Sequence, residues 1–439
     1  MLCVLFAFAF GNTKYGIVID AGSTGTRVNI YSYNQTQNDA IPELKTIAYQ
    51  KFSLRLSDVP KNKSLTKAIG DKVIEVCLKY IPKDLISETR LMLLATAGVR
   101  GLSQEDQKTV MNDIYQYLRS NCEFKFVSED VRVLSDADEG IFGWICTNYL
   151  YRTFQNEKDT YGAVDMGGAS LELTYQLHPS IVSSENRYNV KVGKTYYNVF
   201  SYSYLGYGQE KALDAVVNAS RKEGTRVEVP CYFKDYQEVK DGVTYVGTGN
   251  VNECSKQIDD VLIRDPKFAS IYLPQPNATK HYIPFSTFTY VIQDFMKLPD
   301  DFKLSHFTEY LVKINGTAFS EISKEHSDID PNYLSAYFFD IVYCYKVLAE
   351  GFGLSDLQQT FASPKKVNGV EIGWAMGAML NDIFTIEIKK QFPLYGYILI
   401  AVGVVVLVSI IIIVVIFIKK KGSKNGFKSY EESDKLGLQ

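Results

Sequence analysis

Two short runs of the sequence combine a carboxylate with glycines and hydroxyls in the way that phosphate chemistry requires. The first, Tyr15–Arg27, is YGIVIDAGSTGTR, in which Asp20 follows four apolar residues and precedes the hydroxyls of Ser23, Thr24 and Thr26. Glycines allow backbone N–H groups to approach an anion closely, and a carboxylate at the end of a strand can hold a metal ion through water. The run predicts a phosphate-binding loop with a cation anchor, and a plain hairpin turn is the alternative.

The second run, Tyr161–Leu173, repeats the pattern as YGAVDMGGASLEL. It contains a short apolar strand, then Asp165, then small residues at Gly167, Gly168, Ala169 and Ser170. Two such units, about 145 residues apart, predict two similar lobes that face one phosphate chain. Neither is a Walker loop, because no Gly-Lys-Ser/Thr follows.

Two further clusters supply polar groups. Thr96 and Arg100 lie in ATAGVRGL, where Arg100 has either a phosphate or a neighbouring carboxylate as its partner, and the residues alone favour the carboxylate. Asp136, Asp138 and Glu139 directly precede an apolar helix. Acids at that position also act as ordinary favourable charges at a helix N-terminus, an alternative that is strongest for the two aspartates.

Composition narrows the chemistry. The 439 residues are enough for two lobes with an ample core, and a net charge of −3 does not predict a nucleic-acid-binding surface. The four histidines are not clustered, which argues against a histidine-ligated metal and against a Ser-His-Asp hydrolase. Oxygen ligands favour Mg²⁺ or Ca²⁺.

The elements that must position these residues alternate between strands and helices. Apolar runs predict strands at Gly16–Ile19 and Arg90–Ala95, and periodic patterns predict helices at Lys67–Tyr80, Gln104–Arg119 and Ile141–Tyr151. This alternation predicts an α/β architecture, with a first lobe over residues 14–160 and a second over 161–385, whose C-terminal helix can return to the first lobe. The segment Tyr188–Lys256 gives no clear assignment.

Both ends of the chain have the character of secretory-pathway segments. Residues 1–11 are expected to be a signal peptide, and the uncharged run Leu394–Ile418 is long enough to cross a bilayer. Lysines follow directly, which places the tail, residues 419–439, in the cytosol and the body in the lumen or outside the cell. Five glycosylation sequons, all before residue 390, agree with this single-pass type I topology.

The cysteines offer two candidate disulfides. Cys231 and Cys254 flank a turn-rich stretch and form the more plausible pair, and Cys77 with Cys122 is the weaker one. Cys146 and Cys344 lie in apolar runs and are expected to be free thiols in the core.

With these motifs in place, the sequence resembles the apyrases, the nucleoside triphosphate diphosphohydrolases of the secretory pathway and cell surface. DAGSTGTR, ATAGVR, DEGIFGWICTNYL and DMGGAS resemble the first four conserved regions of that family, in the right order. The similarity continues through Tyr204–Leu213, Tyr282–Tyr290, Tyr337–Gly353 and Trp374–Leu380, and through the arrangement of Cys231, GTGN and Cys254.

The resemblance implies a two-lobed actin-like ATPase (ribonuclease H-like) fold and metal-dependent hydrolysis of a terminal phosphate without a covalent intermediate. By match, Glu139 is the general base, with Thr96 and Ser170 near the transferred group and the attacking water. The metal, Ca²⁺ or Mg²⁺, is assigned to Asp20, Asp165 and Glu172, and the nucleobase to Tyr343. The phosphates are assigned to the two loops, at Ser23, Thr24, Gly25, Arg27, Gly167, Gly168 and Ala169.

Departures from the family pattern leave the substrate open among UDP, GDP, ADP and ATP. Glu172 stands where the family usually has Gln, Asp136 where it often has Gly, and Ala378 where some cell-surface members have a second base-stacking tyrosine. The motif at Trp374 favours the Golgi-type branch. Two alternatives remain: an exopolyphosphatase-like phosphatase, which Glu172 fits, and a catalytically inactive surface binding protein on the same scaffold.

Overall fold

The computed structural model describes residues 13–34, 41–155, 159–181, 185–221, 223–274, 276, 279–384, 386–390 and 405–416. Contacts divide the chain into two units, a large body (Met1–Pro179 and Asn186–Lys390) and a second unit (Ser180–Glu185 and Gln391–Gln439). The predicted signal peptide and the tail 419–439 lie outside the described residues.

The first sheet of the body carries the first candidate loop. Its strands lie in the order β3 (Leu44–Phe52), β2 (Gly25–Asn34), β1 (Thr13–Gly22), β4 (Arg90–Ala95) and β5 (Val131–Val133). β1 pairs with β2 antiparallel and with β4 parallel. The strand predicted at Arg90–Ala95 is confirmed, and the one predicted at Gly16–Ile19 is longer than expected because β1 continues past Asp20 to Gly22.

The second sheet repeats the plan of the first. Its order is β14 (Asp301–Phe302), β15 (Thr360–Ala362), β13 (His281–Ser286), β6 (Gly162–Met166), β7 (Ser170–Gln176), β9 (Thr195–Leu205), β8 (Arg187–Val192) and β16 (Ile386–Lys390). Within it, β9-β7-β6-β13-β15 has the same strand order as β3-β2-β1-β4-β5, with the same antiparallel hairpin and parallel neighbours. The prediction of two similar lobes is therefore confirmed.

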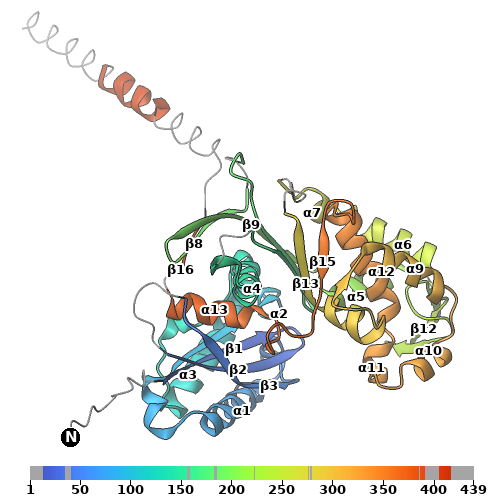
Figure 1. Ribbon diagram of the computed structural model, residues 1–439, viewed down its shortest axis with the longest axis horizontal. Coiled ribbons are helices and arrows are strands. Elements are labelled where there is room, and N and C mark those ends of the chain that lie inside the picture. The colour runs from blue at the N-terminus through green and yellow to red at the C-terminus, as the bar shows by residue number, and fades with distance from the viewer. Residues whose placement is uncertain are drawn as a thin grey trace, which may run out of the picture. The chain divides into compact units, whose positions relative to one another are not determined.

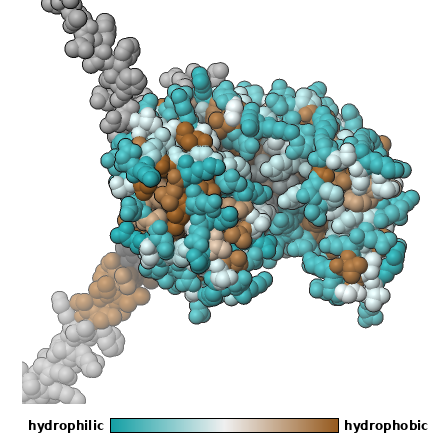
Figure 2. Space-filling model, turned by 90° about the horizontal axis from the view of Figure 1, so that it is seen from below, coloured by the Kyte–Doolittle hydropathy of each residue, from teal (hydrophilic) through white to brown (hydrophobic). Residues whose placement is uncertain are grey.

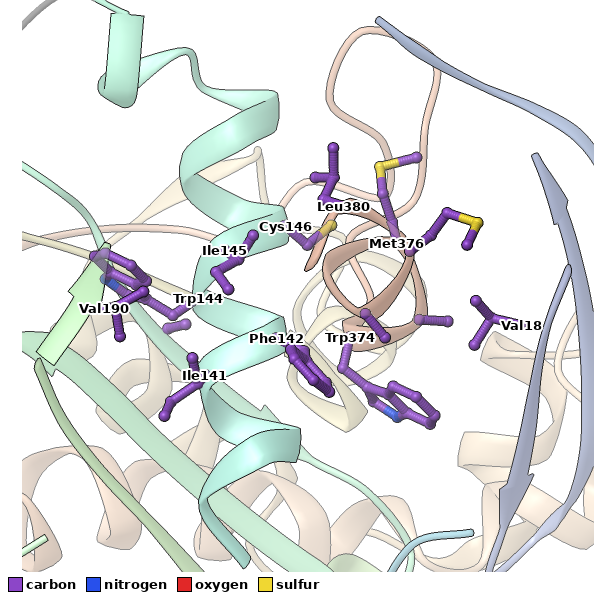
Figure 3. Packing of buried hydrophobic residues seen from close by; sticks show 14 of the residues in the cluster. Val18, Ile141, Phe142, Trp144, Ile145, Cys146, Val190, Trp374, Met376 and Leu380 are labelled. Carbon is purple, nitrogen blue, oxygen red and sulfur yellow. The ribbon is translucent and has the colours of Figure 1, made fainter. Parts of the chain in front are cut away.

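Two helices, α4 (Asp136–Leu150) and α13 (Trp374–Ile383), pack between the two sheets (Figure 1). Their apolar side chains form one core with Val18 of β1 on one side and Val190 of β8 on the other (Figure 3). The helices cross closely, because a Cβ on Gly377 would lie 1.9 Å from the carbonyl oxygen of Phe142. α13 contacts both α4 and β1, so the C-terminal helix of the body packs on the first sheet.

The opposite face of the first sheet is covered by α1 (Ser64–Tyr80) and α3 (Gln104–Asn121). Both predicted helices are confirmed, each slightly longer than expected. Ser103 caps α3 by accepting a hydrogen bond from the N–H of Asp106. Val110, Ile114 and Leu118, spaced by four residues, place one fully buried stripe of α3 against the sheet.

Six further helices gather beyond β13 and β15 (Figure 1). They are α5 (Gln209–Ala219), α6 (Val251–Ile258), α9 (Leu304–Ile314), α10 (Phe319–Glu325), α11 (Pro331–Leu334) and α12 (Tyr337–Lys346). The short helix α7 (Pro266–Ala269) follows α6 in the chain, and α8 (Thr287–Thr289) follows β13 directly. A small third sheet, in the order β10 (Arg226–Val229), β12 (Val243–Gly247) and β11 (Gln237–Lys240), occupies part of the stretch that the sequence left unassigned.

The cysteines follow the sequence predictions in three of four respects. Cys231 and Cys254 form a disulfide, and Cys146 and Cys344 are free and buried, as predicted. The disulfide predicted between Cys77 and Cys122 is wrong, because both thiols are free. The Cys77 side chain belongs to the core beneath α1, and the Cys122 thiol donates to the carbonyl oxygen of Leu118 instead.

The second unit contains a helix at residues 405–416, whose side chains are exposed. No helix among the described residues is both long and apolar enough to cross a membrane. The predicted span Leu394–Ile418 extends on both sides beyond this helix into residues that are not described. The described helix is hydrophobic along its length, whereas the face of the body seen in Figure 2 is mostly hydrophilic.

Candidate active site

Both candidate phosphate loops are tight turns of antiparallel hairpins. β1 ends at Gly22 and β2 begins at Gly25, so Ser23 and Thr24 form the first turn. In the second hairpin, residues 167–169 join β6 to β7. Both runs therefore fold as hairpin turns, the conformation that the sequence analysis gave as the alternative for the first run.

The turns expose backbone donors. Within the described residues, the N–H groups of Ser23, Thr24, Gly168 and Ala169 donate no hydrogen bond. The carbonyl oxygens of the second turn are occupied, since those of Gly167 and Gly168 accept from Gln209 and Lys211 at the start of α5, at 2.9 and 3.1 Å. A turn that is held by its carbonyl oxygens and leaves its N–H groups unused has donors available for an anion.

The two turns lie against each other. A Cβ on Gly168 would lie 2.8 Å from the hydroxyl oxygen of Ser23 and 2.7 Å from Cγ2 of Thr24. A third loop reaches the same point, because a Cβ on Gly98 would lie 2.8 Å from Cα of Ser23. Three backbone segments therefore meet where only glycines leave enough room, which places the polar groups of both sheets around one site.

Each hairpin sets its aspartate opposite a second charged residue seven positions later. In the first, Asp20 pairs in register with Arg27, whose guanidinium donates to the Asp20 carboxylate at 3.1 Å and to the Thr24 hydroxyl at 2.7 Å. In the second, Asp165 pairs in register with Glu172. The two equivalent positions therefore hold an ion pair in one hairpin and two like charges in the other.

Arg100 joins the acids of the site. Its Nη2 lies 2.9 Å from the Glu139 carboxylate, 3.7 Å from that of Glu172, 3.2 Å from the Ser203 hydroxyl and 3.5 Å from the Ser170 hydroxyl. The carboxylate partner that the sequence favoured for Arg100 is confirmed. Glu139 lies in the first turn of α4, which begins five residues earlier than the predicted helix.

Burial dominates the electrostatics of the site. It raises the pKa of Glu139 well above its ordinary value, with the negative charge of Glu172 adding to the rise and Arg100 opposing it. Burial and Glu172 also raise the pKa of Asp165 to about 8, and a hydrogen bond from Ser286 opposes that rise. Burial raises the pKa of Asp20 as well, against the effect of Arg27.

This donor set fits a divalent cation held partly through water. One carboxylate oxygen of Asp20, Oδ1, is buried without a hydrogen-bond partner. Asp165, 7% exposed, faces a second carboxylate with little positive charge near it. Within the described part of the chain, no three His, Cys, Asp or Glu side chains converge closely enough to hold a metal ion by themselves, so a coordination shell here would need other oxygen ligands, such as water.

The other predicted site residues differ in how they are placed. Thr96 stands at the start of the short helix α2 (Ala97–Arg100), and its N–H donates to the carbonyl oxygen of Ala21 beside the first hairpin. Ser170 is buried within reach of Arg100. The Thr26 hydroxyl is turned away, because it donates to the carbonyl oxygen of Leu54 at 2.7 Å.

Tyr343, assigned to the nucleobase, is fully buried. Its ring stacks on Phe339 with centroids 5.1 Å apart, and its hydroxyl donates to the carbonyl oxygen of Tyr207 at 2.8 Å. Neither ring face is open to a base in this arrangement, so base stacking on Tyr343 would require α12 or the segment at Tyr207 to move. Ala378 is also buried, in the core around α4.

Two hydroxyl residues of the site escaped the sequence analysis. The Ser203 hydroxyl, from β9, donates to Glu172 at 2.6 Å. Ser286, the last residue of β13, has a φ of 61°, an uncommon conformation for a residue other than glycine. An isolated serine gives no local sequence signal for a role in the site. Ser286 does follow an apolar run, and so marks a strand end of the kind found at the two aspartates.

The duplicated sheets and facing hairpin turns define a two-lobed α/β fold of the actin-like class. Solved structures agree on the fold. A nucleoside triphosphate hydrolase from Neospora caninum matches 84% of this chain and 92% of its own, with a TM-score of 0.61 and 14% identity. A Ppx/GppA family member from Aquifex aeolicus matches 84% and 98%, with a TM-score of 0.51 and 15% identity.

The sequence comparisons are more specific. The model of the GDA1/CD39 (nucleoside phosphatase) family matches residues 9–394, so the chain belongs to this family. Curated relatives include the Golgi apyrase of Schizosaccharomyces pombe, 28% identical over 84% of this chain and 75% of that protein. Another is the nucleoside diphosphate phosphatase ENTPD5 of Homo sapiens, 28% identical over 86% and 89%. The apyrase resemblance is therefore confirmed, and the protein is a nucleoside phosphohydrolase.

Proposed function

We propose that this enzyme transfers the terminal phosphoryl group of nucleoside di- and triphosphates directly to water, in the site where the two hairpin turns meet. The observation that carries this proposal is the contact of the two turns, whose unused N–H groups point to one phosphate chain, beside the buried carboxylate of Glu139. Hydrolysis of this kind depends on positioning and charge neutralisation rather than on a protein nucleophile.

Glu139 is the proposed general base, which accepts a proton from the attacking water. Arg100 fixes its carboxylate at 2.9 Å and is itself held by Ser203, so the base has little freedom to rotate. Thr96, whose N–H is bonded to Ala21 of the first hairpin, and Ser170, which begins β7, would orient the water by hydrogen bonds from their hydroxyls. The N–H groups of the two turns, with Ser23, Thr24 and Arg27, hold the phosphate oxygens.

Asp20 and Asp165 are the proposed anchors of a divalent cation, Mg²⁺ or Ca²⁺, which when bound would neutralise phosphate charge. Glu172 is held by Ser203 and lies near Arg100, and its role in this design is to balance the charge of Arg100. This role differs from the assignment of Glu172 to the metal, which the family resemblance implies.

A panel of substrates tests the proposal. We expect phosphate release from UDP, GDP, ADP and ATP, with UDP and GDP used at least as well as ATP. The reason is that neither Tyr343 nor Ala378 offers an open aromatic face to the base, so selectivity among bases is weak. The relatives named apyrase and nucleoside diphosphate phosphatase support the same range. Phosphate release should be measured for each nucleotide and for inorganic polyphosphate under identical conditions.

Strict preference for ATP over every diphosphate would argue against this substrate range. Polyphosphate hydrolysis faster than any nucleotide would favour the exopolyphosphatase-like alternative, to which the fold of the Ppx/GppA protein is related. No release from any compound would favour the inactive binding protein.

For location, we propose a Golgi or cell-surface membrane with the body on the lumenal or outer side. Support comes from the uncharged run Leu394–Ile418, the lysines after it, and the relative named Golgi apyrase. In sealed vesicles, protease added from the cytosolic side should remove only the short tail. Electrophoresis before and after digestion measures this, and loss of the body without detergent would contradict the topology.

A further inference from the structure

A row of charged residues crosses three strands of the first sheet. In the strand register, Asp20 of β1 lies opposite Arg27 of β2, which lies opposite Lys51 of β3. Asp20 is on the face that looks toward α4 and α13, because Val18, two residues earlier, belongs to that core, and Ile19 belongs to the other. Lys51 therefore shares a face of the sheet with the aspartate of the first hairpin.

Lys51 is the member of this row that has no partner. Arg27 is engaged by Asp20 and by Thr24, whereas the Lys51 ammonium group makes no hydrogen bond or ion pair with any described residue. Partial burial and, to a smaller extent, the adjacent Arg27 charge lower the pKa of Lys51, and Glu210 and Asp20 oppose this shift. An unpaired cation beside a second cation is an unfavourable arrangement that a bound anion would relieve.

An acid beside the second hairpin also acts electrostatically on Lys51. Glu210, one of the acids that act on it, lies at the start of α5, the helix that holds the carbonyl oxygens of the second turn. A Cβ on Gly168 would lie 3.2 Å from the Glu210 carboxylate. Lys51, an exposed residue of the edge strand, therefore lies close enough to this acid beside the second turn to feel its charge.

Across the strand order, Lys51 lies on the opposite side of Asp20 from the residues proposed to position the attacking water. The strand order is β3-β2-β1-β4, so Lys51 lies on the β3 side of Asp20, and Thr96 and Arg100 follow β4 on the other side. In-line displacement needs the attacking water and the leaving oxygen on opposite sides of the phosphorus. If Glu139 is the base on the β4 side, the leaving phosphate lies on the β3 side.

We infer that Lys51 binds the phosphate that stays with the nucleoside, the leaving group of the reaction, and so sets the affinity for substrate and for the nucleoside monophosphate product. This inference rests on the proposed function. Lys51 lies outside the motifs that the sequence analysis singled out, because it comes from the edge strand β3 and not from a hairpin turn.

The test compares Lys51→Gln with Lys45→Gln, a change of the same kind on β3. Leu44 lies in the core on the α4 side, so its neighbour Lys45 points to the opposite face from Lys51. With UDP as substrate and Mg²⁺ present, Lys51→Gln should raise KM about tenfold or more, with a smaller change in kcat. Lys51→Arg should retain most of the affinity, and Lys45→Gln should match the unaltered enzyme.

Product inhibition separates the leaving phosphate from the transferred one. The inhibition constant of UMP should rise in Lys51→Gln by about the same factor as KM, whereas that of inorganic phosphate should not change. Unchanged KM and UMP inhibition, or a rise confined to inorganic phosphate, would overturn the inference.

A binding experiment distinguishes failure of the proposed function from failure of the inference about Lys51. If the unaltered enzyme releases no phosphate from nucleotides, calorimetric binding of pyrophosphate to the same proteins decides the matter. Binding weakened in Lys51→Gln alone supports Lys51 as a phosphate residue, and equal binding in all variants contradicts it.

Discussion

Replacement of Glu139 by Gln is expected to lower turnover by about 10²–10⁴-fold, the usual contribution of a positioned general base. Gln keeps the size of the side chain and can still accept a hydrogen bond from Arg100, but it cannot take a proton from water. Nucleotide binding should persist, since the N–H groups of the hairpin turns are unchanged. Steady-state kinetics with UDP and direct nucleotide binding measure the two effects separately.

Two matched variants make this result specific. Asp138→Asn makes the same chemical change one residue earlier, at a carboxylate that lies 3.4 Å from Arg132 and outside the site, and should leave turnover unchanged. Glu172→Gln should retain turnover within about tenfold, since the amide oxygen can still accept from Ser203. A loss on Glu172→Gln, with Glu139→Gln active, would make Glu172 the base and favour the exopolyphosphatase-like mechanism.

Removal of divalent cations is expected to abolish turnover, and addition of Mg²⁺ or Ca²⁺ to restore it. The reason is the excess of buried acids: Asp20, Asp165, Glu139 and Glu172 are all buried, Arg27 and Arg100 are the cations paired with them, and a bound cation would stabilise the ionised carboxylates. Phosphate oxygens brought into this site would add to the repulsion. Phosphate release with and without chelator measures the effect, and full activity in excess chelator would exclude the metal assignment.

Thermal unfolding gives a readout that does not depend on catalysis. A cation that binds the folded protein should raise the midpoint of unfolding of the unaltered enzyme. The rise should be smaller in Asp165→Asn, which removes one of the proposed anchors. Since Asn also relieves the repulsion with Glu172, this variant should be at least as stable as the unaltered enzyme when no cation is present.

Local sequence pattern was sufficient to predict the two hairpins and the helices α1 and α3. It was insufficient to predict contacts between segments that lie far apart in the chain. Asp20 and Asp165 were found because a strand, an acid and glycines are adjacent in the chain. Arg100 touches groups from α4, β7 and β9, which no local pattern brings together. Lys51 was missed because its significance depends on the register of β3 with β2.

Two assignments had little support in local pattern. The pairing of Cys77 with Cys122 is wrong, because both thiols are free. The assignment of Tyr343 to the nucleobase stays a prediction. Tyr343 lies in α12, where Phe338, Phe339 and Tyr343 are all fully buried. In so apolar a helix, the sequence cannot distinguish an aromatic ring that packs in the core from one that faces a ligand.

The packing of α13 on β1 determines when the first lobe can fold during synthesis. β1 is among the first segments of the body to be made, and α13 is made about 350 residues later. The two are in direct contact, since a Cβ on Gly16 would lie 2.1 Å from the sulfur of Met379. Until α13 has been made, the apolar face around Val18 lacks the cover that this helix gives it, so we expect the N-terminal lobe to stay incompletely folded. A nascent chain stopped before Trp374 would therefore aggregate instead of yielding an isolated first lobe.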